Sequence, residues 1–189
     1  AIDEQSVTVK NDFSIREEPR LVTVTNFGIE RKANSIVKLA QEISKTPYTL
    51  YVYGGGKYLS RVKETLSKKK QIVFLGEQKN IKEKLAGYDI FVYYSELDNM
   101  PNAVIEAMAC QLPIVTNEVG AINEMITAGK EGLICTLNSF PPQINLLVEN
   151  ESLRKQIGLG ARKKVKKEFS WTQVSKQLLR FYEKIIKLK

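Results

Sequence analysis

Short apolar runs of strand length alternate with helix-patterned segments along most of this chain. The runs occupy residues 21–25, 48–53, 72–75, 89–94, 113–115 and 133–135. They lack the strict apolar–polar alternation of a sheet with one wet face, so both faces of the sheet are expected to be buried. This order predicts a doubly wound, Rossmann-like α/β domain, in which helices cover both faces of a parallel sheet of about six strands.

The two ends of the chain follow different patterns. Residues 1–19 are polar and interrupted by Pro19, which predicts a lead-in or linker with a short strand at residues 7–9, ahead of a domain at residues 20–189. From Pro141 onward the pattern is helical, and a final helix is expected to start near Ser170 and to form a helical tail. One apolar stripe follows this helix: Trp171, Val174, Leu178, Phe181, Ile185 and Leu188. The stripe is expected to pack on this domain or on a part of the protein outside this chain.

The turns that follow the strands are expected to meet at one edge of the sheet. In doubly wound sheets, ligands bind outside the carboxyl ends of the strands, where the strand order reverses. Five turns are therefore predicted to cluster there: residues 26–32, 54–56, 76, 95–101 and 117–121.

The fourth of these turns leads into a helix that contains one unusual residue. Pro101 suits the first turn of a helix, and Asp98 or Asn99 can cap its free amides, which makes the loop a candidate anion site. Within residues 103–110 every residue is apolar except Glu106. A carboxylate in a buried helix needs a protein donor or a pair of ligand hydroxyls, because an unpaired buried carboxylate is strongly unfavourable.

Two other features allow more than one interpretation. The triplet Gly54–Gly56 follows a strand, but the third glycine of a dinucleotide-binding fingerprint would fall at Leu59. A tight turn, which can still lie beside a ligand, is therefore favoured. Arg31 and Lys32 stand in the first turn of the first long helix, where they oppose the helix dipole. Contact with a phosphate would account for them, although adjacent surface cations are also common.

Composition excludes several classes of chemistry. The 189 residues contain no histidine and two cysteines, which excludes Ser-His-Asp and Cys-His catalysis and the usual zinc sites. Residues 150–189 carry 12 of the 29 Lys and Arg residues but only 3 of the 21 Asp and Glu residues. This basic tail is expected to be a solvated helical face or to meet an anionic membrane surface. Nucleic acid is not an expected partner, because no nucleic-acid motif accompanies the charge.

No apolar run approaches the roughly 20 residues of a membrane-spanning helix, and the N-terminus lacks a secretion signal. The predicted location is cytoplasmic, either free or peripheral at the inner face of the membrane. The chain also begins without methionine, so a piece of a longer protein is expected.

Residues 95–110 resemble the acidic E-x7-E segment of the retaining family 4 glycosyltransferases, which have the GT-B fold. Asp98 stands in place of the first glutamate, and Glu106 is the second. Further segments resemble family motifs in the family's order, at residues 111–116, 119–126, 130–134 and 169–171. The likeness covers about residues 20–187.

The resemblance implies the donor-binding C-terminal half of a two-domain enzyme, without its acceptor-binding N-terminal half. Such an enzyme transfers a sugar, with retention of configuration, from a UDP- or GDP-type nucleotide sugar to a glycan or lipid-linked acceptor. It needs no metal and no cofactor. The isolated half is expected to bind nucleotide but to turn over poorly.

The resemblance also implies roles for individual residues. Asp98 and Glu106 are expected to carry the transfer, with Glu106 on the ribose hydroxyls and Asp98 on the donor sugar. Lys32 would neutralise the diphosphate, and Arg31 is the candidate substitute for a family arginine that is absent after the first strand. The remaining implied donor contacts are Gly54, Gly76 and Glu77, of which the last two lie near the base, and Asn99, Met100, Pro101 and Asn102 in the phosphate-facing loop.

Two alternatives stay open at this point. One is a nucleotide-sugar-binding or interaction domain without transferase activity, which the absent arginine favours. The other is a GT-B epimerase, which the absence of histidine disfavours.

Overall fold

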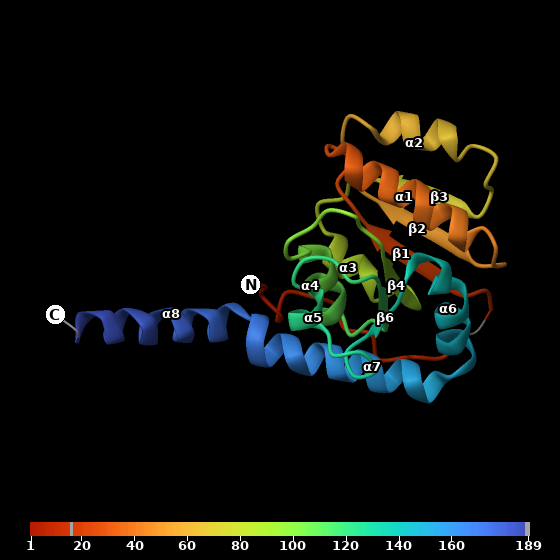
Figure 1. The fold of residues 1–189 in the computed structure, drawn as a ribbon. Helices are drawn as coiled ribbons and strands as arrows, with labels where there is room; N and C mark the ends of the chain where they lie inside the picture. The colour runs from red at the N-terminus through yellow and green to blue at the C-terminus, as the bar shows by residue number, and fades with distance from the viewer. Residues whose placement is uncertain (16, 188–189) are drawn as a thin grey trace.

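The computed structural model describes residues 1–15 and 17–187, and a six-stranded parallel sheet forms its centre (Figure 1). The strands are β1 (Arg20–Val24), β2 (Thr49–Tyr53), β3 (Ile72–Gly76), β4 (Ile90–Tyr93), β5 (Ile114–Thr116) and β6 (Leu133–Ile134). Their order in the sheet is β3-β2-β1-β4-β5-β6, and every neighbouring pair is parallel. The predicted Rossmann-like sheet is therefore confirmed.

Helices cover both faces of this sheet. The helices of the structure are α1 (Glu30–Ile43), α2 (Leu59–Thr65), α3 (Ile81–Leu85), α4 (Asn102–Ala109), α5 (Ile122–Met125), α6 (Phe140–Glu149), α7 (Glu151–Lys164) and α8 (Trp171–Ile186), with a 3-10 turn at Leu137–Ser139 and a π-helical turn at Val165–Phe169. Of these, α8 lies apart from the sheet (Figure 1). Side chains along a strand alternate between faces. In β4, Ile90 and Val92 join the core beneath α1, α2 and α6, whereas Phe91 and Tyr93 join the core beneath α3, α4 and α5. The sheet is therefore doubly wound.

The turns after the strands meet at one edge of the sheet, as predicted. Backbone hydrogen bonds join neighbouring turns: Phe27 N–H to the Gly55 carbonyl (2.9 Å), Gly54 N–H to the Gly76 carbonyl (2.9 Å) and Ala121 N–H to the Asn99 carbonyl (2.6 Å). The strand order reverses between β1 and β4, which leaves a crevice outside their carboxyl ends.

Glycine is required at two positions in this cluster of turns. Gly54 has φ +140° and Gly56 has φ +135°, a region that other residues rarely adopt. A Cβ on Gly54 would lie 1.9 Å from the Thr25 carbonyl oxygen, and one on Gly56 would lie 2.2 Å from the Gly28 nitrogen. These contacts support the tight-turn interpretation, because only glycine lets the two backbones approach so closely.

The N-terminal segment packs against the domain without joining the sheet. Residues 7–9 form no strand, so that prediction is wrong. The reason is that the nearby Lys10 amide donates to the carbonyl of Cys110, just after α4, at 2.9 Å rather than to a strand. Ile2 and Phe13 are buried, and Ile2 pairs with Ser170 ahead of α8.

The last helix projects away from the rest of the molecule (Figure 1). It starts directly after Ser170, as predicted, and the Ser170 hydroxyl caps it by accepting from the Gln173 amide. Packing of its apolar stripe on this domain was one expected outcome and is wrong, because Trp171 and Phe181 are each 58% exposed. Leu188 lies outside the described residues. No helix that the structure describes is long and apolar enough to cross a bilayer.

Candidate functional site

Two adjoining cavities lie at the carboxyl ends of the strands, and they share Val24, which ends β1, and the following Thr25 and Asn26. The first, of about 300 Å³, is also lined by Lys32, Tyr93, Asp98, Met100, Pro101, Asn102, Ala103 and Glu106. The second, of about 450 Å³, is also lined by Tyr53, Gly54, Gly55, Gly56, Glu77, Gln78 and Ile81. A larger cavity, of about 780 Å³, lies beside Lys10 and Asp89 at the opposite ends of the strands and contains none of the predicted site residues.

Asp98 is held by three donors at the wall of the first cavity. Its Oδ2 accepts from Lys32 Nζ at 2.6 Å and from the Tyr93 hydroxyl at 2.5 Å, and its Oδ1 accepts from the Asn99 amide at 3.1 Å. Lys32 comes from the first turn of α1, and Asp98 comes from the loop after β4. The structure therefore brings together the cation and the carboxylate that the sequence predicts to meet a donor.

Glu106 lies in α4 on the wall of the same cavity, where no described residue acts as such a donor. It is partly buried and accepts no hydrogen bond from the residues that the structure describes. Burial raises the pKa of its carboxyl group, although the nearby Lys82 opposes part of that shift. A buried carboxylate can be satisfied by a protein donor or by ligand hydroxyls. The described part of the chain supplies no protein donor to Glu106.

The first turn of α4 presents free amides to the first cavity. The helix begins at Asn102, with Pro101 as its N-cap residue, and no side chain among the described residues caps it. Capping by Asp98 or Asn99 was predicted and is wrong, since the Asp98 carboxylate accepts from Lys32, Tyr93 and the Asn99 amide instead of from the helix. The amides of Asn102 and Ala103 have no acceptor within the helix, and both residues line the cavity. This arrangement suits an anion.

The other predicted residues differ in how close they lie to the cavities. Gly54 and Glu77 line the second cavity, whereas Gly76 supports it by accepting the Gly54 amide. Met100 and Pro101 line the first cavity, as does Asn102, and Asn99 stands behind them with its carbonyl bonded to Ala121.

Arg31 lies outside both cavities and is exposed. Its charge acts on Glu96, whose pKa is held below its usual range by the hydrogen bond from Lys38 and, to a smaller extent, by Arg31. The substitution of Arg31 for the family's arginine stays a prediction.

Two residues that bond to the loop of Asp98 were not singled out from the sequence. Tyr93 ends β4 and bonds to Asp98, and the side chain of Asn117 bonds to both the amide and the carbonyl of Ser95 (3.0 and 2.9 Å). The alternation of β4 could have placed Tyr93 on the same side as α4. Asn117 lies in a turn that was predicted to join this cluster, but no local signal identifies its bond to Ser95, because Ser95 lies in the turn after another strand.

Neither cysteine supplies a thiolate. Burial raises the pKa of Cys110 to about 12 and that of Cys135 to about 11. A thiol with such a pKa is almost fully protonated at neutral pH, and only the thiolate is a strong nucleophile.

The family of the chain follows from residues 8–164, which match the family of group 1 glycosyl transferases. The chain belongs to this family. The matched range includes every residue that lines the two cavities. This group 1 glycosyltransferase chain is 25% identical over 187 residues to the N-acetyl-alpha-D-glucosaminyl L-malate synthase of Bacillus anthracis. That match covers 95% of this chain and 49% of the relative, so the chain spans about half the length of this curated relative.

Two solved structures share the fold of this group 1 glycosyltransferase domain. One is Anabaena HepE in complex with UDP and glucose, with a TM-score of 0.83 and 15% identity over 96% of this chain and 55% of HepE. The other is the C-terminal domain of LpcC, a group 1 glycosyl transferase from Francisella tularensis. It has a TM-score of 0.72 and 18% identity over 90% of this chain and 100% of that domain. Both support the same GT-B-type domain fold.

Proposed function

We propose that this chain is the donor-binding half of a retaining glycosyltransferase that uses a UDP- or GDP-type nucleotide sugar. The observation that carries the proposal is Glu106, whose partly buried carboxylate lines the first cavity and receives no hydrogen bond from a described residue. Two neighbouring ribose hydroxyls would satisfy both oxygens of such a carboxylate. Anabaena HepE, a relative in fold, is known in complex with UDP.

Each part of the donor has a proposed position. The diphosphate would bind at the amides of the first turn of α4 and at Lys32, and the donor sugar would contact Asp98. The base would enter the second cavity beside Gly54 and Glu77. The acceptor, a glycan or a lipid-linked glycan, would be held by an N-terminal half outside this chain.

The proposed chemistry relies on charge stabilisation. Negative charge develops on the leaving nucleoside diphosphate as its bond to the sugar breaks. Lys32 and the free amides of α4 would stabilise that charge, since fixed donors in a partly closed site need little reorganisation. Asp98 positions the sugar in this scheme, and no covalent enzyme intermediate is required.

The nucleotide requirement can be tested with Lys32→Met and its matched control Lys38→Met. Both lysines lie on α1, but Lys38 pairs with Glu96 at the surface, whereas Lys32 lines the cavity. By calorimetry, we expect Lys32→Met to weaken binding of UDP or GDP about tenfold while binding of the nucleoside alone changes little, because only the diphosphate contacts Lys32. Lys38→Met should match the wild type. The proposal would be abandoned if UDP, GDP and ADP all failed to bind the wild-type chain.

Transfer itself needs a separate assay on the chain joined to its N-terminal half. Retention of configuration predicts a product with the anomeric form of the donor. A joined protein that binds the donor but never transfers sugar would favour the alternative of a binding domain without transferase activity.

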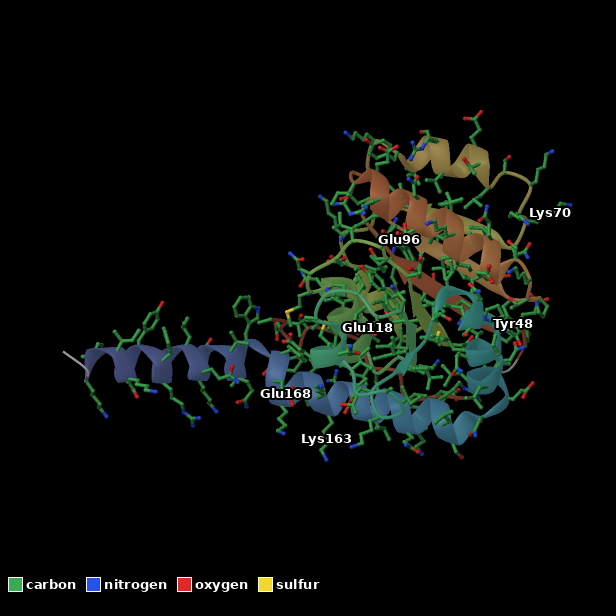
Figure 2. The ribbon with its side chains drawn as sticks, in the orientation of Figure 1. Tyr48, Lys70, Glu96, Glu118, Lys163 and Glu168 are labelled. Atoms are coloured by element: carbon green, nitrogen blue, oxygen red, sulfur yellow. The ribbon has the colours of Figure 1, made fainter. Side chains whose placement is uncertain are left out.

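We also propose that the basic C-terminal helices meet an anionic membrane surface, which would place the protein at the inner face of the membrane. In support, α8 exposes Trp171, Leu178 and Phe181 on one face and carries Lys176 and Arg180 on the other. In Figure 2 its side chains stand clear of the domain. Helices that lie in the membrane interface combine such faces.

Vesicle sedimentation tests this second proposal. We expect the chain to sediment with phosphatidylglycerol vesicles and to be released as salt rises, because ionic strength screens the attraction between lysines and lipid phosphates. The double variant Lys176→Glu with Arg180→Glu should sediment less. Equal binding to neutral and anionic vesicles would contradict the proposal, and absence of binding to both would favour docking of α8 on the rest of the protein.

A further inference from the structure

Tyr93 lines the first cavity, although none of the proposed donor contacts uses it. It is the last residue of β4, and its ring stacks on Phe91 in the core with the ring centroids 6.4 Å apart. Only 5% of Tyr93 is exposed. Because the residue ends its strand at the carboxyl edge of the sheet, its hydroxyl reaches the crevice while its ring stays buried.

The hydroxyl determines which oxygen of Asp98 can meet a ligand. Each carboxylate oxygen has two acceptor positions. Oδ2 uses both, for the Tyr93 hydroxyl at 2.5 Å and Lys32 Nζ at 2.6 Å. Oδ1 uses one, for the Asn99 amide at 3.1 Å. One acceptor position therefore remains on Asp98, and it belongs to Oδ1.

The loop that carries Asp98 does not depend on Tyr93 for its backbone position. Asn117 bonds to both backbone groups of Ser95, and the Ala121 amide donates to the Asn99 carbonyl at 2.6 Å. These contacts hold the loop on either side of Asp98. The Tyr93 hydroxyl bonds to the side chain of Asp98 and also meets the side chain of Ser95, so it acts on side chains of the loop rather than on its backbone groups.

We propose that Tyr93 is a positioning residue that directs Oδ1 of Asp98 toward a hydroxyl of the donor sugar. This inference rests on the proposed function, in which Asp98 contacts that sugar. Asp98 is one methylene shorter than the glutamate at its position in the E-x7-E segment, so its reach depends on the groups that orient it. Burial and the hydrogen bond to Asp98 raise the pKa of Tyr93, which keeps the phenol a donor at physiological pH.

The test compares Tyr93→Phe with Tyr94→Phe. Both variants remove one tyrosine hydroxyl from neighbouring positions, but the Tyr94 hydroxyl bonds to Glu96 at the surface (3.3 Å) and lies outside both cavities. Calorimetry gives the affinities for UDP, UDP-glucose and UDP-N-acetylglucosamine, and for GDP and GDP-mannose. For the nucleotide that binds, we expect Tyr93→Phe to lower the ratio of nucleotide-sugar affinity to nucleotide affinity about fivefold, as for the loss of one hydrogen bond. Tyr94→Phe should leave this ratio unchanged.

A double-mutant cycle with Asp98→Asn separates positioning from simple packing. If Tyr93 acts through Asp98, Tyr93→Phe should have no further effect on the ratio in the Asp98→Asn background. The inference would be overturned if Tyr93→Phe lost affinity equally for nucleotide and for nucleotide sugar. It would also be overturned if the wild-type chain bound the nucleotide sugar no more tightly than the nucleotide. If the wild-type chain binds nucleotide and Tyr93→Phe has the wild-type ratio of nucleotide-sugar affinity to nucleotide affinity, this inference alone is overturned. A wild-type chain that binds no nucleotide would overturn the proposed function together with it.

Discussion

Replacing Glu106 by glutamine is expected to weaken nucleotide binding by a factor on the order of 10 to 100 and to stabilise the free chain. Hydrogen bonds from ribose hydroxyls to a charged acceptor are worth about 1.5–3 kcal/mol, and glutamine loses the charge while keeping the shape. In the free chain the carboxylate is partly buried and has no donor among the described residues, so its charge costs stability. Titration calorimetry and urea unfolding measure the two effects.

The stability effect of Glu106→Gln has a defined pH dependence. Because the folded chain raises the pKa of Glu106, the folded state binds this proton more tightly than the unfolded chain, whose carboxyl titrates near 4.5. The wild type therefore loses stability relative to Glu106→Gln as the pH rises above that value, and the difference is largest at neutral pH.

Glu96→Gln is the matched control for both measurements. Glu96 lies in the loop before the same helix, but Lys38 holds its pKa below the usual range, so its contribution to stability has the opposite sign. We expect this variant to bind nucleotide as the wild type does and to gain no stability. If Glu106→Gln bound nucleotide as tightly as Glu96→Gln, Glu106 would not be a ribose ligand.

Replacing Arg154 by methionine is expected to cost about 3–5 kcal/mol of unfolding free energy, because it leaves several buried carbonyls without a donor. Arg154 lies on α7 and is 3% exposed. Its guanidinium donates to the carbonyls of Leu147 (2.6 Å) and Val148 (2.8 Å) in the last turn of α6, and twice to the carbonyl of Phe13 (2.9 and 2.6 Å). It therefore caps one helix and fastens the N-terminal segment.

Urea unfolding measures this loss, with Lys155→Met as the control. Lys155 follows Arg154 on α7 and is exposed, so its replacement should change stability by less than about 0.5 kcal/mol. Limited proteolysis should also cut Arg154→Met early within residues 1–15, because the Phe13 anchor is lost. Equal stability of the two variants would contradict this account of Arg154.

The elements that were predicted correctly depend on local patterns. The six strands and the start of α8 at Ser170 follow from runs of apolar residues, helical spacing and capping residues, all of which act within a few positions. The clustering of the turns also followed, because parallel strands put their carboxyl ends at one edge. Glu106 could be singled out because it is the only polar residue within residues 103–110.

The wrong predictions concern contacts between distant segments. Residues 7–9 have the composition of a strand, but the N-terminal segment bonds to the end of α4 and to α7 instead. Asp98 is suited to cap α4, but its Oδ2 accepts from Lys32 and Tyr93 and its Oδ1 accepts from the Asn99 amide. In both cases a partner far away along the chain or on another element replaced the local one.

The sequence by itself determined the order of strands and helices along the chain, the edge where the turns meet and the two acidic positions there, because periodicity and residue type act locally. Only the tertiary structure decided that Oδ2 of Asp98 accepts from two donors while Glu106 accepts from none of the described residues. The physical reason is that hydrogen-bond satisfaction depends on the groups that surround an atom in space, and for these carboxylates they come from β4, α1 and the turn before α4.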